Sequence, residues 1–481
     1  MSVVIFNPAP ELFEHYKADK SVIFYTKDGW WVVKESVRVC EGRLTDYNDI
    51  SVIPSISNLI AKVREFGPLW SRWMARGDQY ELVYREALLN ILEVSQGLVK
   101  YSIRIAIFNT GVTHHISTMI FEIACVSVNV KQVFLYTNNI MLGRLLPLIQ
   151  DKSIKDRSPI SVRFSEKEAA ENVNRFIRNR QLGGAPESGG ELPNRREESV
   201  LIAMLSIAKI LIKNILRPLK VAFTGKKARI NILNRFYDYP ASVFFGQVIQ
   251  QYFSLKFYKQ KSDKKKLISI QASKQCSLLI AAHFQPEATS FPEGWGYHNN
   301  VDIVLELKQR GYSKELFYKE HPATFMYTAE GVNFTRVGMY RSRQYYEQLL
   351  QLGCTFIDSS TELSLSSDNQ WYLPVTITGT IAIERSLAGL HTIVTGYPWY
   401  IGLPGTLQLT NLDSLTEIKE EWVTPDPELA KRAFKFLDEM LSGKTMINIL
   451  GFGTGKPSNK ASERKVFLKE FDLLLNSLKE L

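Results

Sequence analysis

The chain has 481 residues, of which 45% are hydrophobic, 11% aromatic and 22% charged, and its formal net charge is +10 at pH 7. This composition excludes a disordered chain, and the length predicts two or three domains, since single cores stop growing at about 250–300 residues. The basic charge favours anionic partners, but no RRM, zinc-finger or helix-turn-helix signature is present, so no nucleic acid is expected among them.

The first half of the chain alternates segments with strand and helix patterns. Runs rich in β-branched and aromatic residues, each followed by turn residues, predict strands at 3–7, 21–26, 103–111 and 131–137. The segment HHISTMIFEIACVSV lies between the last two and has a helical pattern. Strand, helix and strand at this spacing form a βαβ unit, which predicts a parallel sheet.

Two unusual stretches follow. Residues 178–199 are rich in Gly, Pro and charge and predict a mobile insertion. The apolar stretch at 200–216 contains Lys209 and Lys213, and it is shorter than the ~20 apolar residues of a membrane span. We interpret the region 200–230 first as a core helix and second as a helix at an anionic membrane surface, because basic residues follow the apolar stretch.

The second half repeats the α/β pattern after KQKSDKKK at 259–266, which has the composition of an exposed linker. Strands are predicted at 276–284, 316–322, 355–360, 375–380 and 391–396, and helices at 381–390 and 462–481. The expected organisation is two α/β domains at 1–256 and 276–445, a basic linker at 257–275, and a tail with an amphipathic helix at 446–481. Both domains are expected to be doubly wound, Rossmann-like sheets facing a central cleft, with ligands beyond the carboxyl ends of the strands.

The segment KEHP at 319–322 closes one of these strands. Pro322 fixes its own backbone and favours an extended backbone at His321, which makes a rigid platform. Lys319 and His321 could bind a phosphate there, or protonate a leaving group. A solvated, charged strand end accounts for the segment equally well.

The segment TITGTIAIE at 376–384 leads from a strand into a helix. The free N–H groups at a helix start favour an anion, and Gly379 would let a phosphate approach the backbone. Thr378 and Thr380 add hydroxyl donors, and Glu384 lies one turn into the helix, within reach of ribose hydroxyls. The alternative is an ordinary threonine cap with an exposed glutamate. The segment is neither a Walker A loop nor a G-x-G-x-x-G motif.

The segment HFQPE at 283–287 also follows a strand, and it begins a loop that contains two prolines and two glycines up to residue 296. Stiff loops of this kind position functional groups. Glu287 is therefore the candidate catalytic carboxylate, with His283 and Gln285 beside it.

His114 and His115 lie where a strand of the first half turns into a helix, and Arg144 lies beyond the next strand. No third ligand completes a metal site at the two histidines, so contact with a substrate is the better interpretation. The chain contains no D-x-D triplet and no G-x-S-x-G elbow. A metal cofactor is therefore not expected.

The cysteines and the first residues indicate a reducing compartment. Cys40, Cys125, Cys276 and Cys354 lie far apart, which argues against a disulfide framework or a zinc site. The beginning, MSVVIFNPAPELFEHYK, lacks the pattern of a signal peptide. We expect a cytoplasmic protein.

Together, HFQPE, KEHP and TITGT with its following glutamate resemble bacterial capsule and surface polysaccharide biosynthesis proteins. These are glycosyltransferases of the GT-B fold that use CMP-activated 2-keto sugars, namely Kdo and nonulosonic acids such as pseudaminic, legionaminic and sialic acid. Sialyltransferases of similar fold share an HP motif and a Ser/Thr-rich motif that bind CMP. The stretches THHISTMIFE and GRLLP are similar to the N-terminal half of the nonulosonate-transferring members.

The resemblance implies that the domain at 276–445 binds the donor. His321 and Lys319 would hold the CMP phosphate. Three residues would contact the phosphate or cytidine, namely Thr378, Gly379 and Thr380, and Glu384 would bind the ribose. Arg341 or Arg343 could pair with the carboxylate of the donor, since a guanidinium fork suits one; this role rests on chemistry alone.

The resemblance also implies the reacting groups. Glu287 would be the catalytic carboxylate, helped by His283 and Gln285. His114 and His115 would face the sugar or the acceptor from the first domain, and Arg144 could face the same cleft because of its place beyond the next strand. One donor phosphate can be stabilised by a histidine and a helix start without a metal. The family implies retention of configuration through a covalent intermediate, which the sequence itself does not separate from inversion.

The implied partners are a CMP-sugar donor and a surface glycan acceptor. The acceptors include lipid-linked glycans at the inner face of the cytoplasmic membrane. The chain departs from the family pattern at Arg385-Ser386, where small apolar residues are usual.

Two alternatives stay open. One is a non-catalytic glycan-binding or assembly protein of the same fold, and the other is a GT-B nucleotide-sugar epimerase or hydrolase, which product analysis would distinguish.

Overall fold

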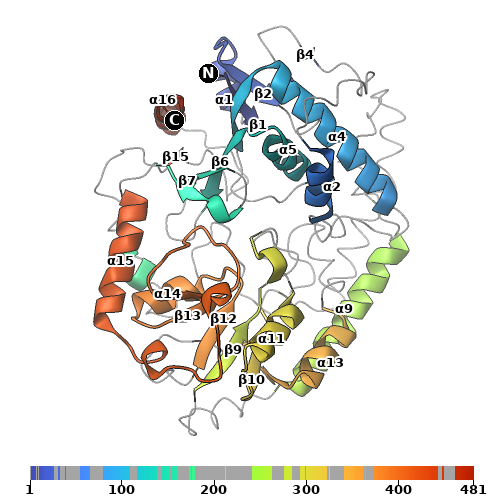
Figure 1. Cartoon of the computed structure of the whole chain (residues 1–481), viewed down its shortest axis with the longest axis vertical. Helices are drawn as coiled ribbons and strands as arrows, with labels where there is room; N and C mark the ends of the chain where they lie inside the picture. The colour runs from blue at the N-terminus through green and yellow to red at the C-terminus, as the bar shows by residue number, and fades with distance from the viewer. Residues whose placement is uncertain are drawn as a thin grey trace. The chain divides into compact units, whose positions relative to one another are not determined.

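The computed structural model describes residues 2–6, 8, 10–25, 31–32, 38–39, 55–65, 80–108, 116–137, 144–151, 154–160, 173–174, 176–178, 212, 241–262, 276–283, 293–297, 299–321, 324, 341–361, 363, 372–442, 447–448 and 461–480. The chain divides into two compact units, one built from residues 1–191 and 437–481 and the other from residues 192–436 (Figure 1). Within the described residues each unit contains one β-sheet with helices packed on it, so the fold is α/β.

The sheet of the first unit has nine strands among the described residues, in the order β15-β7-β6-β5-β1-β2-β3-β4 with β8 beside β7. The four strands β6, β5, β1 and β2 run parallel, and the outer pairs are antiparallel. The helix α5 (Ile116–Ser127) forms the crossover that the parallel strands β5 and β6 need. The bounds of the strands are β1 (Ser2–Phe6), β2 (Val22–Tyr25), β3 (Trp31–Val32), β4 (Arg38–Val39), β5 (Ile103–Phe108), β6 (Lys131–Thr137), β7 (Arg144–Gln150), β8 (Ser158–Pro159) and β15 (Ile447–Asn448).

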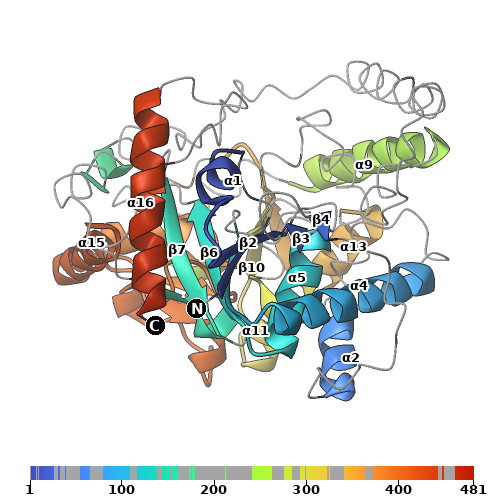
Figure 2. The same ribbon diagram turned by 90° about the horizontal axis from the view of Figure 1, so that it is seen from above.

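The other described helices of this unit are α1 (Pro10–Tyr16), α2 (Ile56–Glu65), α4 (Tyr80–Lys100) and α16 (Ala461–Lys479), with a 3-10 turn at Ile154–Asp156. Although α16 lies at the far end of the sequence, it packs beside α1 (Figure 2). Its buried side chains, including Phe471 and Leu474, join the same core cluster as Val3 and Ile5 of β1. The amphipathic helix predicted at 462–481 is confirmed, and it completes the core of the first unit.

The sheet of the second unit has six described strands, all parallel, in the order β11-β10-β9-β12-β13-β14. Counted along the chain, this is the order 3-2-1-4-5-6 of a doubly wound sheet. The strands are β9 (Ser277–Ala281), β10 (Leu316–Lys319), β11 (Cys354–Ile357), β12 (Tyr372–Thr376), β13 (Thr392–Val394) and β14 (Thr406–Gln408). The helices are α9 (Ala241–Lys261), α11 (Asn300–Gln309), α13 (Arg343–Gln351), α14 (Ile381–Leu387) and α15 (Pro427–Ser442), the last of which continues into the first unit, and short 3-10 turns lie at Trp295–Tyr297, Leu409–Asn411 and Glu420–Trp422.

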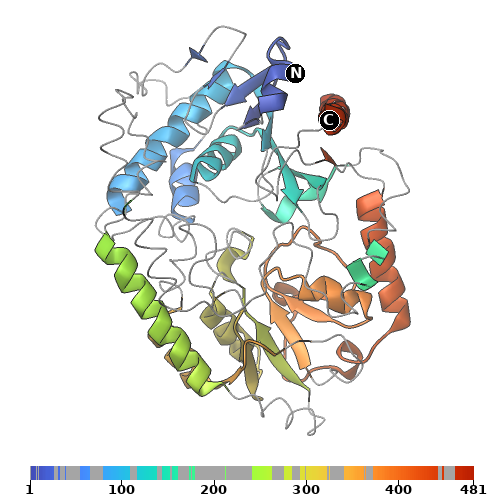
Figure 3. The ribbon, with the colours of Figure 1, turned by 180° about the vertical axis from the view of Figure 1, so that it is seen from behind.

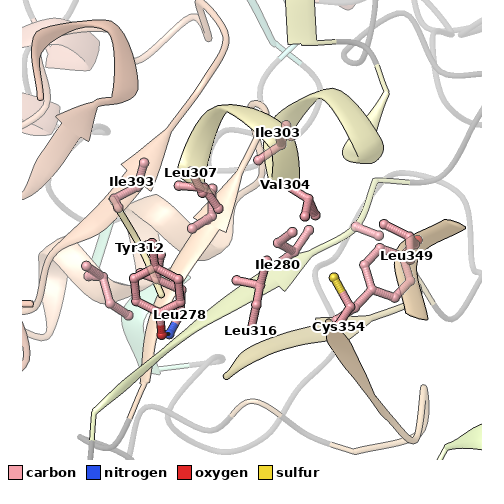
Figure 4. Packing of buried hydrophobic residues seen from close by; sticks show 14 of the residues in the cluster. Leu278, Ile280, Ile303, Val304, Leu307, Tyr312, Leu316, Leu349, Cys354 and Ile393 are labelled. Atoms are coloured by element: carbon pink, nitrogen blue, oxygen red, sulfur yellow. Dashed lines mark hydrogen bonds between the residues drawn. The ribbon is translucent and has the colours of Figure 1, made fainter. Parts of the chain in front are cut away.

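Both faces of this parallel sheet are buried, as crossover helices require. Leu278 and Ile280 of β9 point to one face and pack with Val304 and Leu307 of α11 (Figure 4). Leu279 points to the other face, where it packs with Phe317, Ile357 and Tyr372. The sequences of these strands are therefore continuous apolar runs. The helix α9 packs along α13 and covers part of the sheet (Figure 3).

The strands predicted in the first half are confirmed as β1, β2, β5 and β6, and those in the second half as β9 to β13. The strand predicted at 375–380 starts earlier and ends at Thr376, because the residues after it form the turn into α14. The strand β7 is not predicted, since Pro147 interrupts its apolar run and proline is rare inside sheets.

The expected domain boundary at 256–257 falls inside α9, whose Leu255 and Tyr258 lie in the core of the second unit. The predicted insertion beyond Arg178, the apolar stretch 200–216 apart from Ile212, and the linker residues 263–266 lie outside the described residues. Over the part of the chain that the structure describes, no helix is long and apolar enough to cross a membrane. Three of the four cysteines are described and carry free thiols, namely Cys125, Cys276 and Cys354.

Candidate functional site

The strand order of the second unit reverses between β9 and β12, which are neighbours in the sheet. In doubly wound sheets, ligands bind beyond the carboxyl ends of the strands at such a switch point. The residue His283 follows β9, and the turn Thr376–Gly379 starts at the last residue of β12. The end of β10, with Glu320 and His321, lies on the other side of β9. This edge of the sheet carries the candidate site.

The imidazole of His283 binds the turn after β12. The N–H of Thr378 donates to Nε2 of His283 at 3.0 Å. The hydroxyl of Thr376 lies 3.1 Å from the same nitrogen, and it accepts from the N–H of Gly379 at 3.2 Å. One histidine side chain therefore joins two motifs that lie far apart in the sequence.

These bonds define the protonation of His283. Because Nε2 accepts from a backbone N–H, it carries no proton, and a neutral ring then has its proton on Nδ1. Burial, and to a lesser degree the positive charge of Arg341, lower the pKa of His283 from 6.5 to about 4. His283 is therefore a neutral anchor for the turn near pH 7, with Nε2 already engaged.

The turn itself leaves no room for a larger residue at Gly379. A Cβ atom there would lie 2.5 Å from Oγ1 of Thr376 and 3.4 Å from Nε2 of His283. The hydroxyl of Tyr400 donates to the carbonyl of Gly379 at 2.7 Å, which fixes the turn from the other side. Thr380 precedes α14, and its side chain makes no capping hydrogen bond, so the ordinary threonine cap considered from the sequence does not form.

The glutamate of KEHP is the buried centre of a polar network. Oε2 of Glu320 accepts from Nε of Arg341 at 2.7 Å and from the hydroxyls of Tyr318 and Tyr346, each at 2.9 Å. Oε1 accepts from the N–H of His321 at 2.9 Å. Glu320 has an exposed fraction of 0% and Arg341 of 1%. The segment KEHP is therefore more than a solvated strand end, because the side chain of Glu320 anchors it in the core.

Lys319 and His321 lie on either side of this anchor. Lys319 ends β10 and is buried, whereas His321 is half-buried and follows the strand. The N–H of Ala282 donates to the carbonyl of Lys319, so the ends of β9 and β10 are joined at this point. The two candidate phosphate ligands therefore belong to the same edge as His283, while Pro322 lies outside the described residues.

The two arginines considered for a donor carboxylate have other partners. Arg341 pairs with Glu320, and its Nη2 donates to the carbonyl of His283 at 2.9 Å. Arg343 lies on the surface of α13, where it pairs with Glu347 at 2.8 Å. The structure therefore gives Arg341 a buried contact within the sheet edge, and the ligand contact expected from the sequence stays a prediction.

Glu384 is half-buried in the first turn of α14, and the unusual pair after it is buried. The guanidinium of Arg385 lies over the ring of Tyr372, and its Nε donates to the carbonyl of His391 at 3.0 Å. The hydroxyl of Ser386 donates to the carbonyl of Ala382 within the helix. The departure from the family pattern thus concerns the packing of α14 against the sheet.

Several predicted site residues are not described. His114, His115, Gln285 and Glu287 lie outside the described residues. Arg144 begins β7 and pairs with Asn448 of β15, at the carboxyl end of β6. The structure therefore places Lys319, His321 and the turn at Thr378 and Gly379 at one edge of the second sheet, and the roles of all the candidates stay predictions.

Sequence reasoning missed Glu320, Thr376 and Tyr400 as site residues. A signal existed for Glu320, because Leu316, Tyr318 and Glu320 alternate along the strand and must share one face. The first two belong to a buried cluster, so the third points inward too. Tyr400 gives no local signal, since only the fold brings it to Gly379.

Within the described residues, no group of three His, Cys, Asp or Glu side chains is arranged to hold a metal ion, and the expectation of a metal-free mechanism stays a prediction. No family model, no curated protein and no solved structure matches this chain.

Proposed function

We propose that the protein is a glycosyltransferase of the GT-B fold that moves a nonulosonic acid or Kdo from its CMP donor to a surface glycan. The contact of His283 with the turn Thr376–Gly379 at the switch point carries this proposal. It supports the resemblance because two of its motifs touch where doubly wound sheets bind nucleotides. The third motif, KEHP, is tied to the same edge through Arg341.

The donor phosphate is proposed to lie at this edge, against His321 and Lys319 and the hydroxyls of Thr378 and Thr380. These groups donate hydrogen bonds, as an oxyanion requires, and the nearby carboxylate of Glu320 is already paired with Arg341. A monophosphate leaving group needs less charge compensation than a diphosphate, so the proposed mechanism uses no metal. Glu384 is proposed to bind the ribose.

Glu287 is proposed as the nucleophile of a retaining reaction. Its carboxylate would attack the anomeric carbon as CMP leaves, and a hydroxyl of the acceptor would then displace the carboxylate. Gln285 is proposed to help Glu287. His283 is proposed to contribute by positioning, since its Nε2 is held by Thr378 and its lowered pKa keeps the ring neutral near pH 7.

The acceptor is proposed to meet the first unit, at His114, His115 and Arg144. A lipid-linked glycan at the inner face of the cytoplasmic membrane is the proposed acceptor class. The net charge of +10 supports a peripheral contact with anionic lipid, since basic surfaces attract such membranes.

The proposal is tested first by calorimetry with CMP, UMP, GMP and UDP, on wild type and on His321→Ala. We expect selective binding of CMP that weakens by at least about tenfold in His321→Ala, because a charge-assisted hydrogen bond is lost. The matched control is His15→Ala, which removes an exposed histidine of α1 in the first unit.

The outcomes separate the alternatives. A preference for UDP would keep a nucleotide-sugar enzyme but overturn the 2-keto sugar donor. Absence of nucleotide binding would leave the glycan-binding alternative. If CMP binds, turnover of a CMP-sugar that Glu287→Gln abolishes supports the transferase, whereas free sugar as the product in the presence of acceptor would identify a hydrolase.

A further inference from the structure

The ion pair of Glu320 and Arg341 connects two histidine-bearing strand ends. Arg341 donates through Nε to Glu320 and through Nη2 to the carbonyl of His283, at 2.7 and 2.9 Å. Glu320 accepts from the N–H of His321 at 2.9 Å through its other oxygen. One buried pair therefore holds the backbone of both histidines, just beyond the ends of the neighbouring strands β9 and β10.

The pair is also locked in place by its surroundings. Tyr318 and Tyr346 donate to the same oxygen of Glu320 that Arg341 binds, and the guanidinium lies 4.8 Å from the centre of the Tyr345 ring. A buried ion pair gives little net stability compared with apolar residues of the same size, because both charges lose their hydration. The pair instead gives direction, since each of its two side chains makes one hydrogen bond with a backbone atom of the site, namely the carbonyl of His283 and the N–H of His321.

We propose that Glu320 and Arg341 are positioning residues that set the spacing between the His283 and His321 segments, and through it the affinity for the phosphate of the nucleotide. The inference rests on the proposed function for its ligand, but the spacing itself is a property of the free protein. It assigns Arg341 a role through the backbone of the site, without contact to substrate.

The variant Arg341→Lys isolates this role. Lysine keeps the positive charge beside Glu320, but its single ammonium does not reproduce the rigid fork that reaches both Glu320 and the carbonyl of His283. The matched control is Arg310→Lys. Arg310 also binds a carboxylate, Glu306, and a carbonyl, that of Leu412, but it lies at the end of α11. Both variants lose the same kind of contact, and only one loses it at the site.

The experiment combines two measurements on the full chain. The first is NMR of the imidazole carbons in protein labelled at its seven histidines, with signals assigned by single substitutions. The second is CMP affinity by calorimetry. We expect Arg341→Lys to shift the signals of His283 and His321 but not His15, and to weaken CMP binding by about tenfold, as for one charge-assisted hydrogen bond. Arg310→Lys should change neither.

A purely structural role predicts a different result. If Arg341→Lys lowers only the melting temperature and leaves both histidine signals and the CMP affinity unchanged, the positioning role is overturned. If wild type binds no CMP but Arg341→Lys still shifts both histidines, the proposed function fails and the spacing role stands. Should Arg341→Lys not fold, the neutral double variant Glu320→Gln/Arg341→Met is measured in the same way, because it leaves no unpaired buried charge.

Discussion

Buried polar side chains hold the backbone at the carboxyl edge of the second sheet. His283 accepts from the N–H of Thr378, and Tyr400 donates to the carbonyl of Gly379. Hydrogen bonds are directional, so such side chains orient a turn in a way that apolar packing does not. At the scale of residues, the candidate site is therefore built by buried side chains that position backbone groups. The stability of the site depends on the protonation of these side chains and on the space around them.

The low pKa of His283 predicts a dependence of stability on pH. Above pH 6.5 the residue is neutral in both the folded and the unfolded chain. As the pH falls from 6.5 towards about 4, the unfolded chain takes up a proton that folded His283 does not, so stability is lost in this window. The loss amounts to about 3 kcal/mol at roughly 1.4 kcal/mol for each unit of pKa.

The variant His283→Gln should lack this contribution. We expect its free energy of unfolding in urea to fall less steeply than that of wild type between about pH 6.5 and about pH 4.5. His15→Gln serves as the control, since His15 lies on the surface of α1. Equal slopes for wild type and His283→Gln would show that His283 is not buried in neutral form.

The tight turn at Gly379 predicts sensitivity to one added methyl group. In Gly379→Ala the new Cβ would meet Oγ1 of Thr376 at 2.5 Å and push it away from His283. We expect a cost of about 1–3 kcal/mol in stability from overpacking, together with weaker CMP binding. Gly296→Ala is the control, because nothing lies within 4 Å of its added Cβ. Unchanged stability in Gly379→Ala would contradict the described turn.

At the scale of elements, α16 shows how a helix distant in sequence becomes part of a core. Its residues Phe467, Phe471 and Leu474 are buried in the cluster that contains β1 and β5. The hydroxyl of Tyr16 on α1 donates to Asp472 at 2.5 Å, which fixes the helix along α1. The core of the first unit is therefore built from residues of both the first and the last elements of the chain.

Two adjacent leucines of α16 test this arrangement. Leu474 has an exposed fraction of 0% and Leu473 one of 39%. We expect Leu474→Ala to destabilise the protein by about 2–5 kcal/mol through the lost burial and the remaining cavity. Leu473→Ala should cost less than about 1 kcal/mol, because its side chain already meets solvent. Thermal and urea unfolding measure both, and similar losses for the two variants would rule out the described orientation of α16.

At the scale of the whole molecule, the two units differ in the order of their strands. The second unit has the all-parallel order with a switch point between β9 and β12, whereas the first unit adds antiparallel strands around a parallel centre. A nucleotide is therefore expected to bind the second unit, at the edge that carries His283 and His321. This division predicts where a bound nucleotide should change the dynamics of the protein.

Hydrogen exchange of the full chain with and without CMP checks this prediction. We expect slower exchange at 276–283, 316–321 and 376–384, because a ligand at this edge opposes local opening. Amides of β5 and β6 in the first unit serve as the internal reference, and GMP as the control ligand. Protection confined to the first unit would exclude the proposed donor site.

Local patterns predicted much of the fold. Apolar runs with β-branched or aromatic residues identified β1, β5, β9 and β10, because parallel strands are buried on both faces and need apolar residues. The antiparallel strands β3, β4, β8 and β15 were not predicted, since each has two residues and is too short to show a hydrophobic periodicity. The boundary at 256–257 failed because a basic, exposed helix end resembles a linker, while Leu255 and Tyr258 on the same helix face the core.

For the site, the sequence by itself determined the candidate groups of the second unit, including His283, His321 and the turn around Gly379, because polar residues after apolar strands mark the carboxyl edge. Only the tertiary structure decided what these groups do. His283 holds Thr378, and Arg341 pairs with the buried Glu320, because burial and partner choice depend on contacts between segments far apart in the chain. Protonation and hydrogen bonding follow from those contacts, and no local pattern encodes them.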